Sequence, residues 1–171
     1  APEEVFEALR KCAEKSGYKQ VRISGNEPTL AKDHLFRILE LFQKTDYQFI
    51  LETNGILINK DYARQLCSFR NMKVRVSLKG TNPDEFSLLT GAVPEAFHLQ
   101  MEALRNLAQA GVTFWPAVML SFSSKSNSGK LREEIRKILH SLEKEIEEEY
   151  IFLYPHVAKR LKERGLNPLV A

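Results

Sequence analysis

The sequence predicts an α/β protein in which about five parallel strands form a partial barrel. Five segments with the period-two alternation of strands are separated by segments with the spacing of amphipathic helices, as in parallel sheets joined by helical crossovers. The strand segments are apolar on one face only, most clearly over 73–79, where valine and leucine alternate with arginine, serine and lysine. An open sheet covered by helices would be apolar on both faces, whereas a barrel can have a polar inner face. The 171 residues are too few for eight barrel units, which need about 250.

The first half of the chain holds two strand–helix repeats behind an opening helix. That helix starts at Pro2, because proline suits the first turn and the acidic residues after it favour the positive helix end, and it stops at Gly17. Asn54 and Gly55 are a strong turn signal behind the second strand. The predicted elements are a helix over 2–16, a strand over 20–24, a helix from about 33, a strand over 48–53 and a helix from about 59.

The second half continues the alternation with longer helices. Gly80 ends the third strand, and five serines mark 121–129 as a mobile loop. The glutamates of 143–149 and the cations of 159–164 are interpreted as solvated helix faces. The predicted elements are a strand over 73–79, a helical turn over 84–89, a helix over 94–110, a strand over 112–120, a helix over 130–149, a strand over 150–154 and a basic helix over 156–164.

Composition excludes several classes of protein. The net charge of +3 gives no argument for nucleic acid as a partner, and no aromatic platform is evident beside the basic cluster. No apolar stretch of about 18 residues could span a membrane. The two cysteines, Cys12 and Cys67, are interpreted as small core side chains, and they are too few for a disulfide framework or a cysteine-only metal site. The histidines lack metal-ligand spacing, so no metal site is expected, and a reducing cytoplasm is the expected location.

Polar residues gather where the predicted strands end, which is where parallel barrels bind their ligands. Glu52, Ser77 and Lys79 lie inside strands, where a charge is costly unless it is paired. Two interpretations fit: a structural Glu52–Lys79 ion pair inside the barrel, or a polar ligand site. The candidate site residues are Gly25, Asn26, Glu27, Glu52, Thr53, Asn54, Ser77, Lys79 and His156, with Ser121 at the end of the fourth strand.

Four motifs in this order resemble the radical S-adenosylmethionine enzymes, in particular the branch of the pyruvate formate-lyase activating enzyme. Residues 21–30 are similar to the Gly-Gly-Glu-Pro segment of the family, and residues 52–55 to its Asp/Glu-Thr-Asn-Gly. Residues 76–80, followed by 89–91, resemble its Asp-x-Lys strand and Leu-Thr-Gly, and residues 153–156 its Leu-Pro-Tyr-His. The resemblance covers about residues 20–156.

The resemblance implies a partial (β/α)6 TIM-like barrel that holds S-adenosylmethionine at the carboxyl ends of its strands, with the first strand of the family lying upstream of Ala1. By analogy, Gly25, Asn26 and Glu27 would meet the amino group of the methionine moiety. Lys79 would contact the carboxylate, and His156 the ribose or adenine. The remaining candidates would line the same end: Glu52, Thr53, Asn54 and Ser77.

The chain also departs from the family. Asn26 replaces the second glycine, Ser77 replaces the acid around which relatives build a cation site, and 114–116 lacks the arginine of the activating enzymes. The Cys-x3-Cys-x2-Cys run that holds a [4Fe–4S] cluster in this family is not in the sequence. We therefore expect one radical S-adenosylmethionine core domain over 1–171, N-terminally truncated and inactive by itself.

In the complete protein, the resemblance implies an iron–sulfur oxidoreductase. A reductant protein and the [4Fe–4S] cluster would cleave S-adenosylmethionine to a 5′-deoxyadenosyl radical, which abstracts hydrogen from an unknown small-molecule or protein substrate. Two alternatives stay open. One is a Schiff-base aldolase that uses the Lys79 amine. The other is a non-enzymatic nucleotide or metabolite binder.

Overall fold

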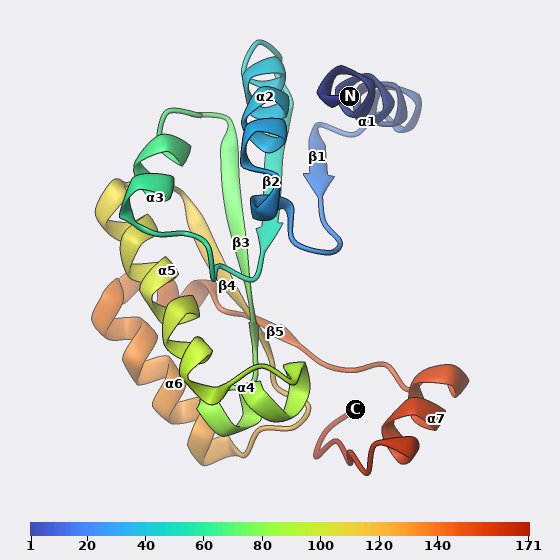
Figure 1. Ribbon diagram of the computed structural model, residues 1–171, viewed down its shortest axis with the longest axis vertical. Coiled ribbons are helices and arrows are strands. Elements are labelled where there is room, and N and C mark those ends of the chain that lie inside the picture. Colours follow the sequence, from blue (N-terminus) through green and yellow to red (C-terminus); the bar gives the residue numbers. More distant parts are fainter. The chain divides into compact units, whose positions relative to one another are not determined.

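The computed structural model describes all residues, 1–171, and arranges five strands in one sheet in the order β1-β2-β3-β4-β5 (Figure 1). The pairs β1–β2, β2–β3 and β4–β5 are parallel, so the predicted α/β class is confirmed. The strands are β1 (Gln20–Ile23), β2 (Gln48–Thr53), β3 (Met72–Lys79), β4 (Phe114–Met119) and β5 (Glu147–Glu149).

Helices alternate with these strands along the chain, as the sequence predicts. None of the helices combines the length and the apolar character needed to cross a membrane. The α-helices are α1 (Pro2–Ser16), α2 (Lys32–Phe42), α3 (Lys60–Leu66), α4 (Pro83–Thr90), α5 (Phe97–Ala110), α6 (Lys125–Ile138) and α7 (Pro155–Glu163), and the 3-10 segments are η1 (Pro28–Leu30), η2 (Pro94–Ala96) and η3 (His140–Glu145).

The first of two compact units comprises Ala1–Val76 and Leu99–Phe114, and its core is aromatic. The buried ring of Phe42 meets Phe6 edge-on at 4.8 Å and Phe49 at 5.3 Å between centroids. Burying one such side chain stabilises a fold by about 1.5–3 kcal/mol. The helix α1 packs on α2 and on β1, so it covers the apolar face of that edge strand.

The second unit comprises Ser77–His98 and Trp115–Ala171, and a carboxylate ties its segments together. Glu85 Oε2 accepts hydrogen bonds from Thr81 N (2.8 Å), Thr81 Oγ1 (2.7 Å) and Ser123 Oγ (2.5 Å), and Glu85 Oε1 accepts one from Asn127 Nδ2 (2.9 Å). Burial opposes the charge of Glu85, but hydrogen bonds from Ser123, Thr81 and Asn127 outweigh it and hold the pKa of this carboxyl below its ordinary value. The segment after β3, α4 and the start of α6 are thereby joined.

The predicted mobile loop over 121–129 is wrong, because α6 starts inside it. Ser124 caps the helix, accepting a hydrogen bond from Asn127 N at 3.1 Å, and Ser123 is buried. Serine favours helix N-caps as well as loops, so a count of serines could not separate the two.

The predicted helix over 130–149 and strand over 150–154 are also wrong in their bounds. The helix α6 ends at Ile138, and β5 occupies three glutamates, with Glu147 opposite Ala117 of β4. Glutamate is depleted in strands, so the sequence favoured a helix here. The structure supplies the missing partners. Trp115 Nε1 donates to Glu147 at 2.8 Å, and Arg132 of α6 pairs with Glu148.

Both cysteines are free and exposed, so their interpretation as core side chains is wrong. Helix α1 buries Ala13, the residue after Cys12, against the rest of the unit. Cys67 lies one residue past the buried Leu66, at the C-cap of α3. In both helices the apolar face ends one residue away from the thiol.

Candidate functional site

The loop after β1 has a left-handed backbone at two consecutive residues. Gly25 has a φ of 91° and Asn26 a φ of 49°, and asparagine tolerates this region better than most side chains. Gly25 and Asn26 are both exposed. Neither takes part in the two backbone hydrogen bonds of the loop, which the carbonyl oxygens of Glu27 and Pro28 accept. Exposed peptide groups therefore face solvent at the carboxyl end of β1. Asn26 adopts the conformation that a glycine would supply at this position of the motif.

The carboxylate of Glu27 fixes this loop to the end of β2. Its Oε1 accepts hydrogen bonds from Thr29 N (3.1 Å), Thr29 Oγ1 (2.6 Å) and Thr53 Oγ1 (2.7 Å), and its Oε2 accepts one from Asn54 N (2.7 Å). The Thr53 hydroxyl also accepts from Gly55 N at 3.0 Å, so both of its roles are used within the protein. The Glu27 Oε2 atom retains acceptor capacity for one more donor.

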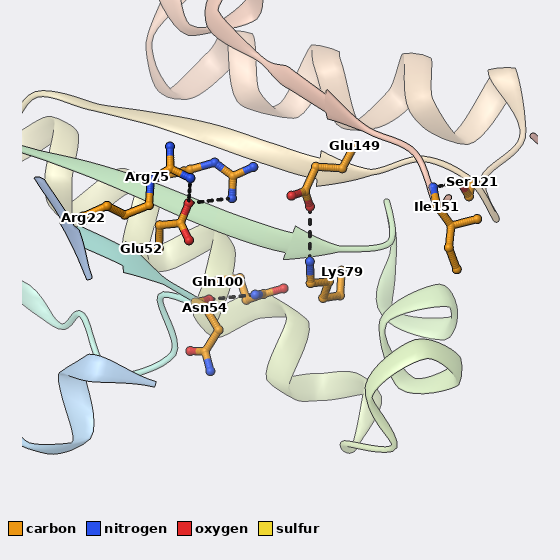
Figure 2. Close-up of polar contacts among 9 residues, drawn as sticks. All are labelled: Arg22, Glu52, Asn54, Arg75, Lys79, Gln100, Ser121, Glu149 and Ile151. Atoms are coloured by element: carbon orange, nitrogen blue, oxygen red, sulfur yellow. Dashed lines mark hydrogen bonds and ion pairs between the residues drawn. The ribbon is translucent and has the colours of Figure 1, made fainter. Parts of the chain in front are cut away.

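The turn after β2 is held from both sides. The Asn54 carbonyl accepts from Gln100 Nε2 of α5 at 2.7 Å (Figure 2), and Asn54 Oδ1 accepts from Ile56 N at 2.9 Å. Gly55 has a φ of 81°, and a Cβ there would lie 3.0 Å from Ala103 Cβ. Glycine is required here both for its conformation and for the close approach of α5. The turn presents the Asn54 side-chain amide at the end of β2.

Glu52 is paired within the first unit, on the polar face of the sheet (Figure 2). Its Oε1 lies 2.8 Å from Arg22 Nη1 and 3.5 Å from Arg75 Nη1, one partner on each neighbouring strand. The Arg75 side chain is 9% exposed, so this ion pair satisfies a buried guanidinium. The expected Glu52–Lys79 ion pair is wrong: the structure pairs Glu52 with two arginines instead.

In the second unit, Lys79 at the end of β3 faces Glu149 of β5. Its Nζ lies 3.2 Å from Glu149 Oε2 (Figure 2). Ser77 precedes Lys79 by two residues, so its side chain lies on the same face of β3. Ser121 lies beyond β4 and anchors the segment after β5, because its Oγ accepts from Ile151 N at 2.7 Å (Figure 2).

His156 lies in the first turn of α7, not on a strand. Its ring is exposed and stacks on Tyr154, with 5.8 Å between centroids and 8° between planes. The aromatic neighbour of this histidine therefore comes from the segment just before the helix.

A hollow of about 420 Å³ opens beside the loop after β1. Gly25, Glu27 and His34 line it, together with apolar side chains of α1 and α2. Sequence reasoning missed His34 here, although its place at the start of the helix behind the loop was a usable signal. It also missed Glu149, because the glutamate run was assigned to a helix.

Residues 1–122 match the sequence profile of the Radical SAM superfamily. The chain belongs to this superfamily. The resemblance drawn from the four motifs is thereby confirmed for the three that lie within the matched residues, and the motif at 153–156 lies beyond them. Membership does not favour the aldolase or the non-enzymatic binder.

Curated relatives include two proteins named probable GTP 3′,8-cyclase. The protein of Pyrobaculum aerophilum is 35% identical over 94 residues, which cover 55% of this chain and 29% of that protein. The protein of Methanosarcina acetivorans is 31% identical over 113 residues, covering 66% of this chain and 33% of that protein. The chain thus spans about a third of the length of these relatives.

Solved structures share the fold at low sequence identity. Streptococcus suis SuiB bound to S-adenosylmethionine superimposes with a TM-score of 0.72 at 17% identity, covering 96% of this chain and 40% of that one. Native anSMEcpe with bound AdoMet gives a TM-score of 0.58 at 17% identity, covering 96% and 53%. These likenesses establish the fold, which agrees with the predicted partial barrel.

Proposed function

We propose that this chain is the S-adenosylmethionine-binding part of the barrel of a radical S-adenosylmethionine enzyme. The loop at Gly25 and Asn26 carries the proposal, because it presents exposed peptide groups in a left-handed conformation at the end of β1. Glu27 fixes this loop to β2 through Asn54. Membership of the superfamily supports the proposal, since the motifs that form this loop lie within the matched residues.

The amino group of the ligand needs hydrogen-bond acceptors. In the proposal, it donates to the carbonyl oxygens of Gly25 and Asn26 and to the remaining acceptor position of Glu27 Oε2. Asn54 lies beside Glu27 and offers a side-chain amide. Thr53 positions the loop without contacting the ligand, because its hydroxyl is used within the protein. Glu52 orders the polar face of the sheet through its ion pairs with Arg22 and Arg75.

Lys79 is proposed to bind the carboxylate of the ligand. Its ammonium already lies against a carboxylate oxygen, that of Glu149, at 3.2 Å. A ligand carboxylate would replace this partner with a similar charge-assisted hydrogen bond. Ser77, on the same face of β3, and the ring of His156 are proposed as further contacts, His156 for the ribose or adenine.

Bound S-adenosylmethionine supplies the radical that abstracts hydrogen from the substrate in this superfamily. The residues of this chain do not fit the [4Fe–4S] cluster, which needs three thiolates. The two cysteines lie on α1 and at the end of α3, and no group of three or more metal-ligating side chains is present. We therefore assign no electron-transfer step to these residues, and propose that the complete protein brings the cluster ligands and meets a reductant protein.

The reaction named for the relatives, GTP 3′,8-cyclisation, is not transferred here, since the shared region is a third of their length. A reducing compartment fits the proposal, because both cysteines are free thiols.

Titration calorimetry with S-adenosylmethionine tests the assignment of Lys79. We expect Lys79→Ala to weaken binding about tenfold, the loss of one charge-assisted hydrogen bond. Lys125→Ala, an exposed lysine of the same unit, is the matched control and should bind like the unaltered chain. Equal affinities of the two variants would place the carboxylate elsewhere.

A further inference from the structure

Three aromatic rings form an exposed row between β5 and the first turn of α7. Phe152 is 70% and Tyr154 54% exposed, with their ring centroids 4.5 Å apart, and His156 continues the row by stacking on Tyr154. Hydrogen bonds within the second unit fix the segment that carries these rings. Tyr154 N donates to Phe152 O at 2.8 Å, and Ile151 N, just before Phe152, donates to Ser121 Oγ. Adjacent aromatic rings that are exposed to solvent are typical of a binding surface.

Cations follow the ring row directly. Lys159 and Arg160 lie three and four residues after His156, so they share its side of α7. Both are exposed. Residues 155–164 carry four cations and one carboxylate, Glu163, which lies 3.9 Å from Lys159. The row of rings thus runs into a patch of positive charge, which is the arrangement that the sequence alone did not reveal.

We propose that this surface, the rings of Phe152, Tyr154 and His156 with Lys159 and Arg160, binds single-stranded nucleic acid. Every base has a π-face that can stack on an exposed ring whatever the sequence, and the cations neutralise the adjoining phosphates. Charge complementarity and the exposed rings favour this partner over an acidic protein, which would need the cations but not a row of rings.

The apolar side of α7 argues against a membrane as the occupant. Val157 and Leu161 are half-buried, and the chain beyond α7 returns to Ser121, whose carbonyl oxygen accepts a hydrogen bond from Leu169 N at 2.6 Å. A membrane-bound helix would leave that side open to insert between lipids. This surface shares His156 with the proposed S-adenosylmethionine site. The test therefore leaves His156 unaltered and changes only the other four residues.

Fluorescence anisotropy with labelled DNA and RNA strands of about 12 nucleotides tests the proposal. Phe152→Ala and Tyr154→Ala should each weaken binding, by roughly tenfold for one stacked base. The double variant Lys159→Ala/Arg160→Ala should lower the slope of log affinity against log salt by about 1.4, at about 0.7 per phosphate contact. Matched controls in the first unit are Tyr18→Ala, which is 66% exposed, and Lys11→Ala/Lys15→Ala.

The controls should bind like the unaltered chain, and circular dichroism melts should show every variant folded. Absence of binding at low salt, or equal losses in the variants and their controls, would overturn the proposal. So would GTP binding as tightly as an oligonucleotide, which indicates a mononucleotide site. Binding to phosphatidylglycerol vesicles without binding to oligonucleotides would assign the surface to a membrane and overturn it as well.

Discussion

Replacing Glu27 with glutamine should loosen the link between the loop after β1 and the end of β2. The amide can keep its oxygen at the Oε1 position, where it still accepts from Thr29 and Thr53. Its NH2 group then faces the Asn54 amide, which now donates to Oε2 at 2.7 Å. Two donors meet there. The opposite orientation is worse, because it places the NH2 group against three donors.

The cost follows from that lost hydrogen bond. A backbone N–H that loses a charged acceptor costs about 1–3 kcal/mol, and Asn54 is half-buried, so we take about 2 kcal/mol. For a chain of this length, the melting temperature should fall by roughly 4–8 °C. If the loop opens locally, exchange of the Asn54 amide should accelerate by about 30-fold.

Urea and thermal unfolding measure the loss of stability, and amide hydrogen exchange measures the local opening of the loop. Glu14→Gln is the matched control, because Glu14 is an exposed glutamate that pairs with Arg10 on the surface of α1. It should change stability by less than about 0.5 kcal/mol. If Glu27→Gln is as stable as Glu14→Gln and the Asn54 amide exchanges at the original rate, the Glu27 carboxylate does not hold the loop to the end of β2.

Three further predictions concern other parts of the chain. Gly80→Ala should destabilise the second unit by more than about 2 kcal/mol in urea unfolding, because φ is 86° and a Cβ would lie 2.7 Å from Glu85 Cβ. Gly91→Ala is the control: its φ is 75° but no atom lies near the added Cβ, so it should cost only about 1 kcal/mol. Equal costs of the two substitutions would contradict the close contact at Gly80. Because the pKa of Glu85 is lowered in the folded state, its contribution to stability is present above the ordinary glutamate pKa and is lost as the pH falls through the folded value. Melts at descending pH should therefore lose stability more steeply for the unaltered chain than for Glu85→Gln, and parallel curves would refute this. Reconstitution with iron and sulfide should leave the chain without stoichiometric [4Fe–4S] absorbance and without 5′-deoxyadenosine formation under a reductant, whereas a stable cluster would show that two cysteines suffice.

Local signals in the sequence were sufficient for most strands and helices. The strand over 48–53 has the predicted bounds, because Asn54 and Gly55 end it with a turn that only glycine can complete. The opening helix ends as predicted, with Gly17 in the left-handed conformation. These features depend on a few neighbouring residues, and the residue types themselves indicate the backbone conformation they favour.

Features set by distant partners could not be predicted in the same way. β5 consists of glutamates that no strand propensity would select, and it exists because β4 and cations from other elements satisfy them. Glu27 was predicted as a ligand contact from a motif. In the structure its carboxylate accepts hydrogen bonds from Thr53, which lies 26 positions later in the chain, and from Asn54, which lies 27 positions later. Sequence spacing indicates that such residues share one end of the sheet, and only the folded chain shows which side chains are already paired.

Titration of the 15N-labelled chain with S-adenosylmethionine, followed through the backbone amide resonances, shows whether the loop after β1 binds this ligand. We expect saturable shifts at Gly25, Asn26 and Asn54, with Gly17 and Gly111 unchanged. Shifts confined to other residues, or none up to saturating ligand, would contradict binding at this loop.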